Sequence, residues 1–516
     1  MPTFDFTQEA PLSGVGFVYK STTEAFYYDG STVTTIRAAA AFTVTTGSGT
    51  TTMNISAVAS GTVVVGMTVT GLAASRTIAS FGTFDGTSGT VILSSSTTWS
   101  NPTSVTGVYA VDADYPVTTV RGIVYLDGTY YVMTPNGSIY GSAINNSLSW
   151  SSLNVIQSQG EPDGGVMLAR QLNLLVSFGG YSTEFFYDAA NATGSPLLPY
   201  DSAMLEIGCA VAESVAQTDN TCYFMGVSKQ KGRSLYRLIG TKPEYVSNSF
   251  IDRIFNADDL ATVTSFCCRI AGHVFYVIYL DTTGITLVYD STSNEWATWT
   301  VSTLATPGAI TSATWASGVV TVTKAAHGYG DGDVVVIASS SPSTYNGEYT
   351  VNVPTSSSFT YNLASDPGTY VGSATSANYT QEPFAISSYT SGNNLDIIQD
   401  STTGFVYLLD SGTYEDNSNP LDVLIRTFKW DSGSNKKKFI SQLEIIGDKV
   451  DSDAYIRYSN DDYQTWSQYR PVDLNVSRSL LNRQGQTRRR AYELRHHDNV
   501  ALRLEALEIT PVEGSN

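Results

Sequence analysis

Short runs of β-branched and aromatic residues, separated by Gly, Asp and Asn, recur along almost the whole chain. One example is Val120–Leu126, which an Asp-Gly pair separates from Tyr130–Met133. This arrangement is typical of strands joined by tight turns. Long helical stretches rich in Ala, Leu, Glu and Lys are nearly absent, and the one helix that we expect is Ser249–Leu260, with Asn248 or Ser249 as its cap. The pattern therefore predicts an all-β protein.

The segment Leu287–Trp299 is the clearest predicted hairpin. A β-rich run ends at Tyr289, a polar turn follows, and the returning strand carries Trp296 and Trp299. Blades of β-propellers close with hairpins of this kind, and other heavy hairpins recur at intervals of roughly 40–50 residues, which is blade spacing. We therefore expect a β-propeller in which Trp296 and Trp299 seal one blade.

Two segments, 38–110 and 305–381, differ in amino-acid composition from the rest of the chain, because they have few charged residues and many Thr, Ser and Gly residues. We interpret them as inserted β-domains. The last propeller blade is expected to include Val423–Phe428. The C-terminal unit is expected to be β-sandwich-like and to contain a strand at Gln464–Tyr469. The predicted order is first propeller strands 1–37, inserted β-domain 38–110, propeller blades 111–304, second inserted β-domain 305–381, last propeller blade 382–427 and C-terminal unit 428–516.

The formal net charge is −19, and it is unevenly spread. Residues 1–419 hold 13 Lys and Arg against 33 Asp and Glu, whereas residues 420–516 hold 15 against 14. An acidic body repels nucleic acid, so a domain that grips DNA is disfavoured. The alternative is that the net negative charge only keeps the protein soluble and says nothing about its partners.

Catalytic signals are poor. The chain has four histidines; His273 lies in an apolar run and is expected to be a core residue, and the adjacent His496 and His497 would diverge on a strand. The Gly- and Asp-rich run 328–333 lacks the spacing of an EF-hand and is expected to be a plain turn. No hydrolase, nucleotide-binding or zinc motif occurs. We therefore expect no catalytic, cofactor-binding or metal-binding residues, and no enzyme.

The four cysteines form no CxxC pair, so we expect reduced, buried thiols and assembly in a cytosol. The N-terminus has no basic region followed by an apolar core, and we expect no signal peptide. The longest apolar run is too short to span a membrane.

Two C-terminal features stand out. The run 459–466 resembles the Asp-box hairpin of sialidase-like propellers: Ser459, Asp461, Thr465 and Trp466 match it, and Tyr463 occupies its glycine position. In that hairpin these residues are structural. The second feature is a basic cluster that is a candidate docking surface for an acidic face of a neighbouring subunit. A phosphate-contacting surface and a charge-protected edge strand are the alternatives. Its members are Lys436, Lys437, Lys438, Arg488, Arg489, Arg490 and Arg495.

The segment Glu161–Asp188 resembles the packaged-DNA stabilisation proteins of short-tailed phages, also called tail hub or nozzle proteins. It has the same order of Pro-Asp-Gly, an apolar strand, Phe-Gly, Ser-Thr-Glu and an aromatic strand. The C-terminal end is similar as well, with the hairpin 458–466, an Arg-rich segment 478–495 and a closing strand Ala501–Ile509. The resemblance covers about 112–300 and 384–510, and both inserts resemble modules of phage tail proteins.

The resemblance implies a structural protein of the virion, assembled in the host cytoplasm as a homo-hexameric ring in the tail. The ring would lie below the portal and the tail adaptor protein, contact tail fibre or tailspike proteins, retain the packaged DNA and permit its ejection. Genomic DNA would pass through the lumen without specific binding. Two alternatives remain open from the sequence: a sialidase-like propeller hydrolase, and a carbohydrate-binding tail fibre or receptor-binding module.

Overall fold

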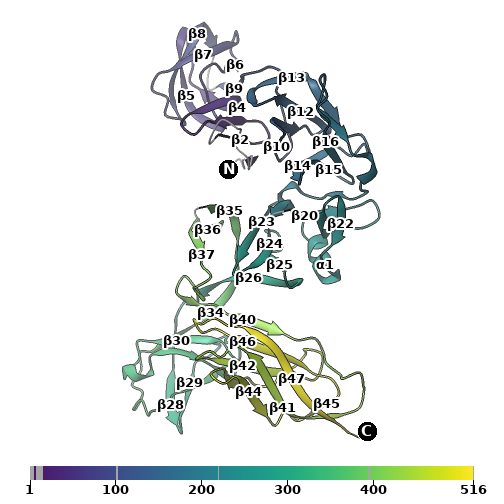
Figure 1. The fold of residues 1–516 in the computed structure, drawn as a ribbon. Coiled ribbons are helices and arrows are strands. Elements are labelled where there is room, and N and C mark those ends of the chain that lie inside the picture. The colour runs from purple at the N-terminus through teal and green to yellow at the C-terminus, as the bar shows by residue number, and fades with distance from the viewer. Residues whose placement is uncertain (1–4, 7–15, 100–102, 219, 393–394, 515–516) are drawn as a thin grey trace. The chain divides into compact units, whose positions relative to one another are not determined.

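The computed structural model describes residues 5–6, 16–99, 103–218, 220–392 and 395–514, and their regular secondary structure is almost entirely β. Strands hold 57% of the residues and helices 4%, which confirms the predicted all-β class. The chain forms two compact units, Met1–Ala297 and Thr298–Asn516 (Figure 1), which are described in turn.

A closed sheet of six strands forms the first insert. Its strand order is β4-β5-β8-β7-β6-β9, and β9 pairs back onto β4. Fully buried Phe42, Met53 and Met67 fill the interior, so the closed sheet has its own apolar core. The strands are β4 Val33–Val44, β5 Gly47–Gly61, β6 Thr68–Thr70, β7 Arg76–Phe81, β8 Gly89–Trp99 and β9 Thr103–Ala110. The short strands β1 Asp5–Phe6, β2 Phe17–Lys20 and β3 Ala25–Tyr28 precede it and lead antiparallel into β4.

Two four-stranded antiparallel sheets follow, and each is built from consecutive strands, which is the organisation of propeller blades. The strands of the first are β10 Val124–Leu126, β11 Thr129–Met133, β12 Ser138–Ala143 and β13 Asn146–Gln157. Those of the second are β14 Gly165–Gln171, β15 Leu174–Gly179, β16 Thr183–Asp188 and β17 Leu197–Pro199. The short 3-10 turns η1 Asp201–Ala203 and η2 Ala212–Ser214 come next.

The first unit ends with two more sheets of the same kind. One contains β18 Gly208–Cys209, β19 Ala216–Thr218, β20 Thr221–Val227, β21 Ser234–Ile239 and β22 Lys242–Tyr245. The other contains β23 Val263–Ile270, β24 His273–Leu280, β25 Ile285–Asp290 and the first residues of β26 Glu295–Leu304. Helix α1 Ser249–Ala257 lies between them in sequence. The predicted cap is confirmed, because the Asn248 side chain accepts hydrogen bonds from the backbone N–H groups of Phe250 and Ile251.

The predicted hairpin around residue 290 is present as β25, a four-residue turn and β26. Asp290 orders the turn by accepting hydrogen bonds from Thr292 N and Ser293 Oγ. Trp296 packs its ring against Tyr289 and Phe255, with ring centroids 5.3 and 6.4 Å away. Trp296 thus anchors its sheet to α1. Trp299 is half-buried and belongs to the second unit.

The second unit begins with the second insert, a pair of small sheets around a shared core of residues such as Val320, Val335 and Phe359. One sheet has the order β28-β29-β33-β32, and in the other β34 pairs with β26, β27 and β30. The strands are β27 Gly308–Ala309, β28 Ser312–Ala316, β29 Val319–Thr323, β30 Val334–Ala338, β31 Gly347–Thr350, β32 Asn352–Thr355, β33 Ser358–Asn362 and β34 Thr375–Pro383, with the 3-10 turn η3 Ser343–Tyr345 before β31.

A three-stranded sheet and a short hairpin follow. The sheet consists of β35 Ile386–Gly392, β36 Leu395–Asp400 and β37 Val406–Leu409, and the hairpin of β38 Glu415–Asp416 and β39 Asn419–Pro420. Asp416 in the hairpin accepts a hydrogen bond of 2.6 Å from Ser302 N, and Asn419 donates one to Ser302 O. The hairpin is therefore fixed to β26.

The C-terminal region is a sandwich of two antiparallel sheets around Leu443, Ile456 and Leu494. One sheet has the order β40-β46-β42-β43, and in the other β41 pairs with β44, β45 and β47. The strands are β40 Val423–Arg426, β41 Lys438–Gly447, β42 Asp453–Ser459, β43 Arg470–Asp473, β44 Arg478–Asn482, β45 Gln486–Thr487, β46 Ala491–His496 and β47 Leu504–Glu513.

Three local predictions were wrong. The segment Val423–Phe428 belongs to the sandwich and not to a blade, because β40 pairs with β46. The predicted strand Gln464–Tyr469 is a bend followed by irregular backbone, because Thr465 bonds to Asp461 through both its N–H and its hydroxyl, and β43 begins only at Arg470. His273 is not a core residue: its side chain is 49% exposed, because it starts β24 and contacts Asp290 at the sheet edge.

Candidate functional site: an arginine–carboxylate cluster in the second unit

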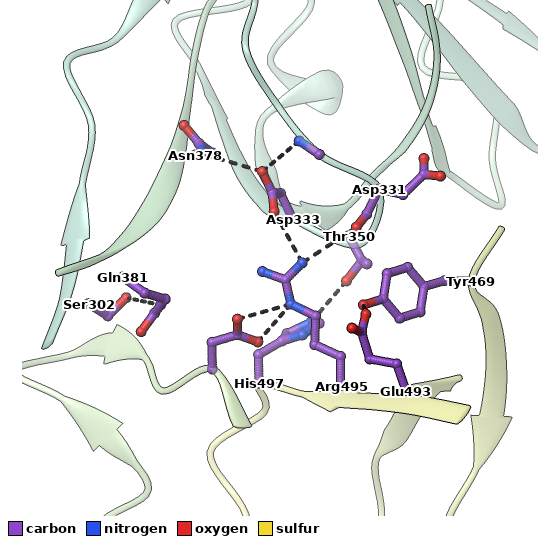
Figure 2. Close-up of polar contacts among 12 residues, drawn as sticks. Ser302, Asp331, Asp333, Thr350, Asn378, Gln381, Tyr469, Glu493, Arg495 and His497 are labelled. Carbon is purple, nitrogen blue, oxygen red and sulfur yellow. Dashed lines mark hydrogen bonds and ion pairs between the residues drawn. The ribbon is translucent and has the colours of Figure 1, made fainter. Parts of the chain in front are cut away.

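A polar cluster in the second unit is centred on Arg495 of β46 (Figure 2). Its Nε donates to both carboxylate oxygens of Asp422, at 2.8 and 3.0 Å, and one terminal nitrogen lies 3.1 Å from Asp333 Oδ1. Burial by itself lowers the pKa of Arg495, but Asp422 and Asp333 raise it further than burial lowers it. The guanidinium is therefore a permanent cation shared by two carboxylates.

The turn that holds Asp333 comes from the second insert. Asp333 Oδ2 accepts hydrogen bonds from Gly330 N at 2.8 Å and from the Asn378 side chain at 3.3 Å. Gly332 has a φ of +82°, and a Cβ at this position would lie 2.6 Å from the Tyr469 ring. A glycine is thus required both by the backbone and by the close approach of the sandwich. The turn joins the insert to the C-terminal sandwich.

His497 makes a second connection between the same two parts. Its Nε2 lies 2.9 Å from Thr350 Oγ1 on β31, and its ring stacks on Tyr455 with centroids 5.3 Å apart. Burial lowers the pKa of His497, and the nearby carboxylates of Asp498 and Asp422 offset this only in part. The neighbouring His496 instead contacts Ser452 Oγ at 2.9 Å, so the two histidines do diverge.

Glu493 forms a third polar centre on the same strand, and its side chain is fully buried. It accepts hydrogen bonds from Arg457 Nε at 2.6 Å, from Arg426 Nε and from the Tyr469 hydroxyl. Burial by itself raises the pKa of Glu493, but these three donors lower it by more. A buried carboxylate with full pairing of this kind rigidifies the sheet.

This arrangement suits a mechanical junction. Arg495 pairs with Asp333 and Asp422, and Glu493 accepts from three donors, so these three carboxylates are all held by partners within the second unit. Within the described ranges, no group of three or more His, Cys, Asp or Glu side chains converges as a metal site. The chemistry of the cluster is to hold the second insert against the sandwich.

The candidate docking surface is only partly on the surface, and the prediction was wrong for three of its members. Lys438 and Arg490 have exposed fractions of 0% and 1%, and Arg495 lies in the cluster above. Arg490 donates to Asn460 Oδ1 and Gln484 O and stacks 3.9 Å over Tyr458. These cations point inward because carbonyl, amide and aromatic groups satisfy them there. The exposed members are Lys436, Lys437, Arg488 and Arg489.

The residues of the predicted Asp-box hairpin do come together. Asp461 accepts hydrogen bonds from Thr465 N, Thr465 Oγ1 and Ser459 Oγ, which lower its pKa to about 2. Tyr463, at the glycine position of the motif, has a φ of +70°, as a glycine there would allow. Arg457 stacks 5.0 Å over Trp466. The hairpin is thus a structural element beside the Glu493 centre.

The residues that organise the cluster were missed by the sequence reasoning, apart from Arg495. Asp333 was assigned to a plain turn, and Asp422, Tyr469 and Glu493 were not singled out. The only available signal was a carboxylate inside a strongly β-forming strand, as at Glu493, because charged residues in a buried strand need a partner. Nothing in the sequence identifies that partner.

Fold and site together define an all-β structural protein assembled from blade-like sheets. The family described as "Bacteriophage P22 Gp10, beta-propeller" matches residues 48–333. The chain belongs to this family of phage DNA-stabilisation proteins, which confirms the predicted resemblance and the propeller and gives the chain a structural role in the virion.

No curated protein has a significant sequence match to the chain. Solved structures that align with it include the designed protein Ika8, with 11% identity, coverage of 77% of this chain and 93% of that chain, and a TM-score of 0.27. BamB from Moraxella catarrhalis has 14% identity, and its alignment covers 78% of this chain and 93% of BamB, with a TM-score of 0.26. An exo-β-1,3-galactanase from Phanerochaete chrysosporium has 13% identity, and its alignment covers 77% of this chain and 98% of the galactanase, with a TM-score of 0.23. Over the part of the chain that the structure describes, no helix is long and apolar enough to cross a membrane.

Proposed function

We propose that this protein is a ring-forming hub or nozzle of a short-tailed phage tail, which extends the DNA channel below portal and adaptor. The ring, a homo-hexamer, retains the packaged genome and opens a path for its ejection. The observation that carries the proposal is the family match over residues 48–333, which covers most of the first insert, the blade-like sheets of the first unit and the start of the second insert.

Charge supports a channel that DNA passes through without being held. Residues 1–419 have 33 acidic against 13 basic side chains. Tight binding to DNA needs several Lys or Arg side chains that neutralise phosphates, and an acidic wall offers the opposite sign. Low affinity for DNA suits a channel in which the genome must slide quickly.

The paired polar groups of the second unit support a rigid role. Arg495, Asp333 and Asp422 connect the second insert to the sandwich, and Ser302 connects the hairpin 415–420 to β26. A component that bears the pressure of packaged DNA needs modules that do not hinge freely. The inserts, poor in charge and rich in hydroxyl groups, would face neighbouring tail proteins such as fibres or tailspikes.

The test is the mass and shape of the purified protein. We expect a hexameric ring with an open lumen, measured by analytical ultracentrifugation and electron microscopy. Phage particles that lack the protein should package DNA and then lose it, as measured by the DNA content of purified particles. A stable monomer that cleaves glycosides would instead support a hydrolase, and a trimer that binds polysaccharide would support a fibre.

A further inference from the structure

One end of the C-terminal sandwich carries exposed cations beside exposed apolar side chains. Phe439 on β41 is paired with Gln486 of β45 on one side and with Val512 of β47 on the other. Paired residues of neighbouring strands project to the same face of a sheet. Phe439 is 54% exposed and Val512 is 59% exposed, so this face is open to solvent. Together with Lys436, Lys437 and Arg488, these two residues are called the basic–apolar patch.

Buried Lys438 holds the two basic segments of the patch together. Its Nζ donates to the carbonyl oxygens of Ser434, Lys436 and Arg488, the last at 2.8 Å. In addition, Arg488 donates to the carbonyl oxygen of Asn435 at 2.7 Å. The chain segments before β41 and after β45 are therefore fixed against each other. A partner would meet cations that are already in place, which lowers the entropic cost of binding.

The cations of the patch have no ion pair with any residue that the structure describes. Among the described residues, no carboxylate lies within ion-pair distance of Lys436, Lys437 or Arg488, and the acidic neighbour Glu513 stands opposite Lys438 on β47. Elsewhere on the same sandwich, Arg478 pairs with Glu444 and Glu508. Among the described residues of the sandwich, the cations at this end therefore remain available to a partner.

The rest of the chain has the complementary charge. Residues 298–419 contain a single basic residue, Lys324, against ten Asp and Glu, and residues 1–297 contain 12 basic against 23 acidic. Nucleic acid is a poorer fit, because the apolar Phe439 and Val512 beside the cations of the patch offer no hydrogen bonds to replace the water that hydrates a phosphate backbone. An acidic protein surface with apolar side chains at its centre satisfies both halves of the patch.

We propose that the basic–apolar patch docks onto an acidic surface of a neighbouring copy of this chain. This inference rests on the proposed ring, and it identifies the face of the sandwich that holds one copy to the next. Complementary charge orients the two copies and speeds their encounter, and burial of Phe439 and Val512 keeps them together.

The test compares two double charge reversals in the full-length protein. The patch variant is Lys437→Glu/Arg488→Glu. The control variant is Lys449→Glu/Arg503→Glu, which changes the net charge equally at exposed positions near the other end of β41. Assembly is measured by sedimentation over a range of concentrations and salt. We expect the patch variant to need at least a tenfold higher concentration for half-assembly, and the control to assemble like the natural protein.

A third variant, Phe439→Ser, separates the apolar part from the charges: it should weaken assembly without reducing its salt dependence. Circular dichroism and thermal unfolding check that all variants fold. If the natural protein does not assemble, the proposed ring itself fails. If the natural protein assembles and the patch variant assembles equally well, this inference alone fails. It fails also if the patch variant assembles normally but loses binding to anionic phosphatidylglycerol vesicles or duplex DNA that the control retains.

Discussion

Arg495 and Asp333 lie 162 positions apart in the chain, yet their side chains meet at 3.1 Å. One belongs to an inner strand of a C-terminal sheet and the other to a turn of the second insert (Figure 2). Both side chains are largely buried, with exposed fractions of 14% and 18%. The ion pair therefore acts where solvent screens it little, and it links two modules that each have their own apolar core.

Replacement of Arg495 by Met should destabilise the second unit strongly. It leaves Asp333 and Asp422 near each other without their shared cation, and removal of one partner from a buried pair costs on the order of 3–5 kcal/mol. Urea unfolding measures the loss. The double variant Arg495→Met/Asp333→Asn should recover part of it, because one uncompensated charge is removed as well. Equal stability of Arg495→Met and the natural protein would contradict the role of the pair.

Replacement of Gly332 by Ala should weaken the same junction. The new Cβ would meet the Tyr469 ring at 2.6 Å, and the φ of +82° disfavours any side chain. Gly328→Ala is the matched control, because Gly328 also has a positive φ, +72°, but open space around its Cβ position. We expect each replacement to lower the free energy of unfolding by roughly 1 kcal/mol because of the strained backbone. Gly332→Ala should lower it by about 1–3 kcal/mol more because of the clash with the ring. Thermal unfolding and protease cleavage between the modules report the difference; a control that is equally damaging would refute the packing argument.

The second unit should lose stability in mild acid through His497. Its pKa is lowered in the folded protein, mainly by burial, from an ordinary value of 6.5. The unfolded chain therefore takes up a proton near pH 6.5, whereas the folded chain resists protonation to lower pH. The contribution of neutral His497 to the free energy of unfolding is fully present above pH 6.5. It falls as the pH drops from 6.5 toward the pKa of His497 in the folded protein.

The measurement is urea unfolding between pH 7 and 5, for the natural protein and for His497→Gln. His496 also has a lowered pKa through burial and contributes in the same direction, so His496→Gln is measured in parallel. We expect each replacement to flatten part of the pH dependence. A slope that is unchanged in both variants would show that other groups cause it.

The four thiols should be inert in the folded protein. Burial raises the pKa of Cys209 and Cys222 to about 12 and that of Cys267 well above its usual range, and Cys268 is buried. Because the thiolate is the reactive form, a disulfide reagent such as DTNB at pH 8 should label few or none of them. All four should react after denaturation in guanidinium chloride. Rapid labelling of the native protein would mean that the sheets of residues 208–290 open readily.

Local patterns in the sequence are enough to predict the strands, the turns and one helix. Asn248 precedes an amphipathic run and caps α1, and the polar turn after Tyr289 sends the chain back as β26. These elements depend on neighbours within a few residues, through turn chemistry, capping and side-chain alternation. The resemblance to phage tail proteins added the family, which its match over residues 48–333 confirms.

Only the tertiary structure decided which charged side chains face inward. Lys438, Arg490 and Arg495 have the same local appearance as Lys437, Arg488 and Arg489, because each stands in a run of basic residues. Their burial depends on carbonyl groups at 434, 436 and 488, on Tyr458, and on carboxylates at 333 and 422. Strand pairing over long sequence distances brings these partners together. By itself, therefore, the sequence determined the all-β elements and their turns, whereas the choice between a buried junction and a free basic surface was made by long-range packing.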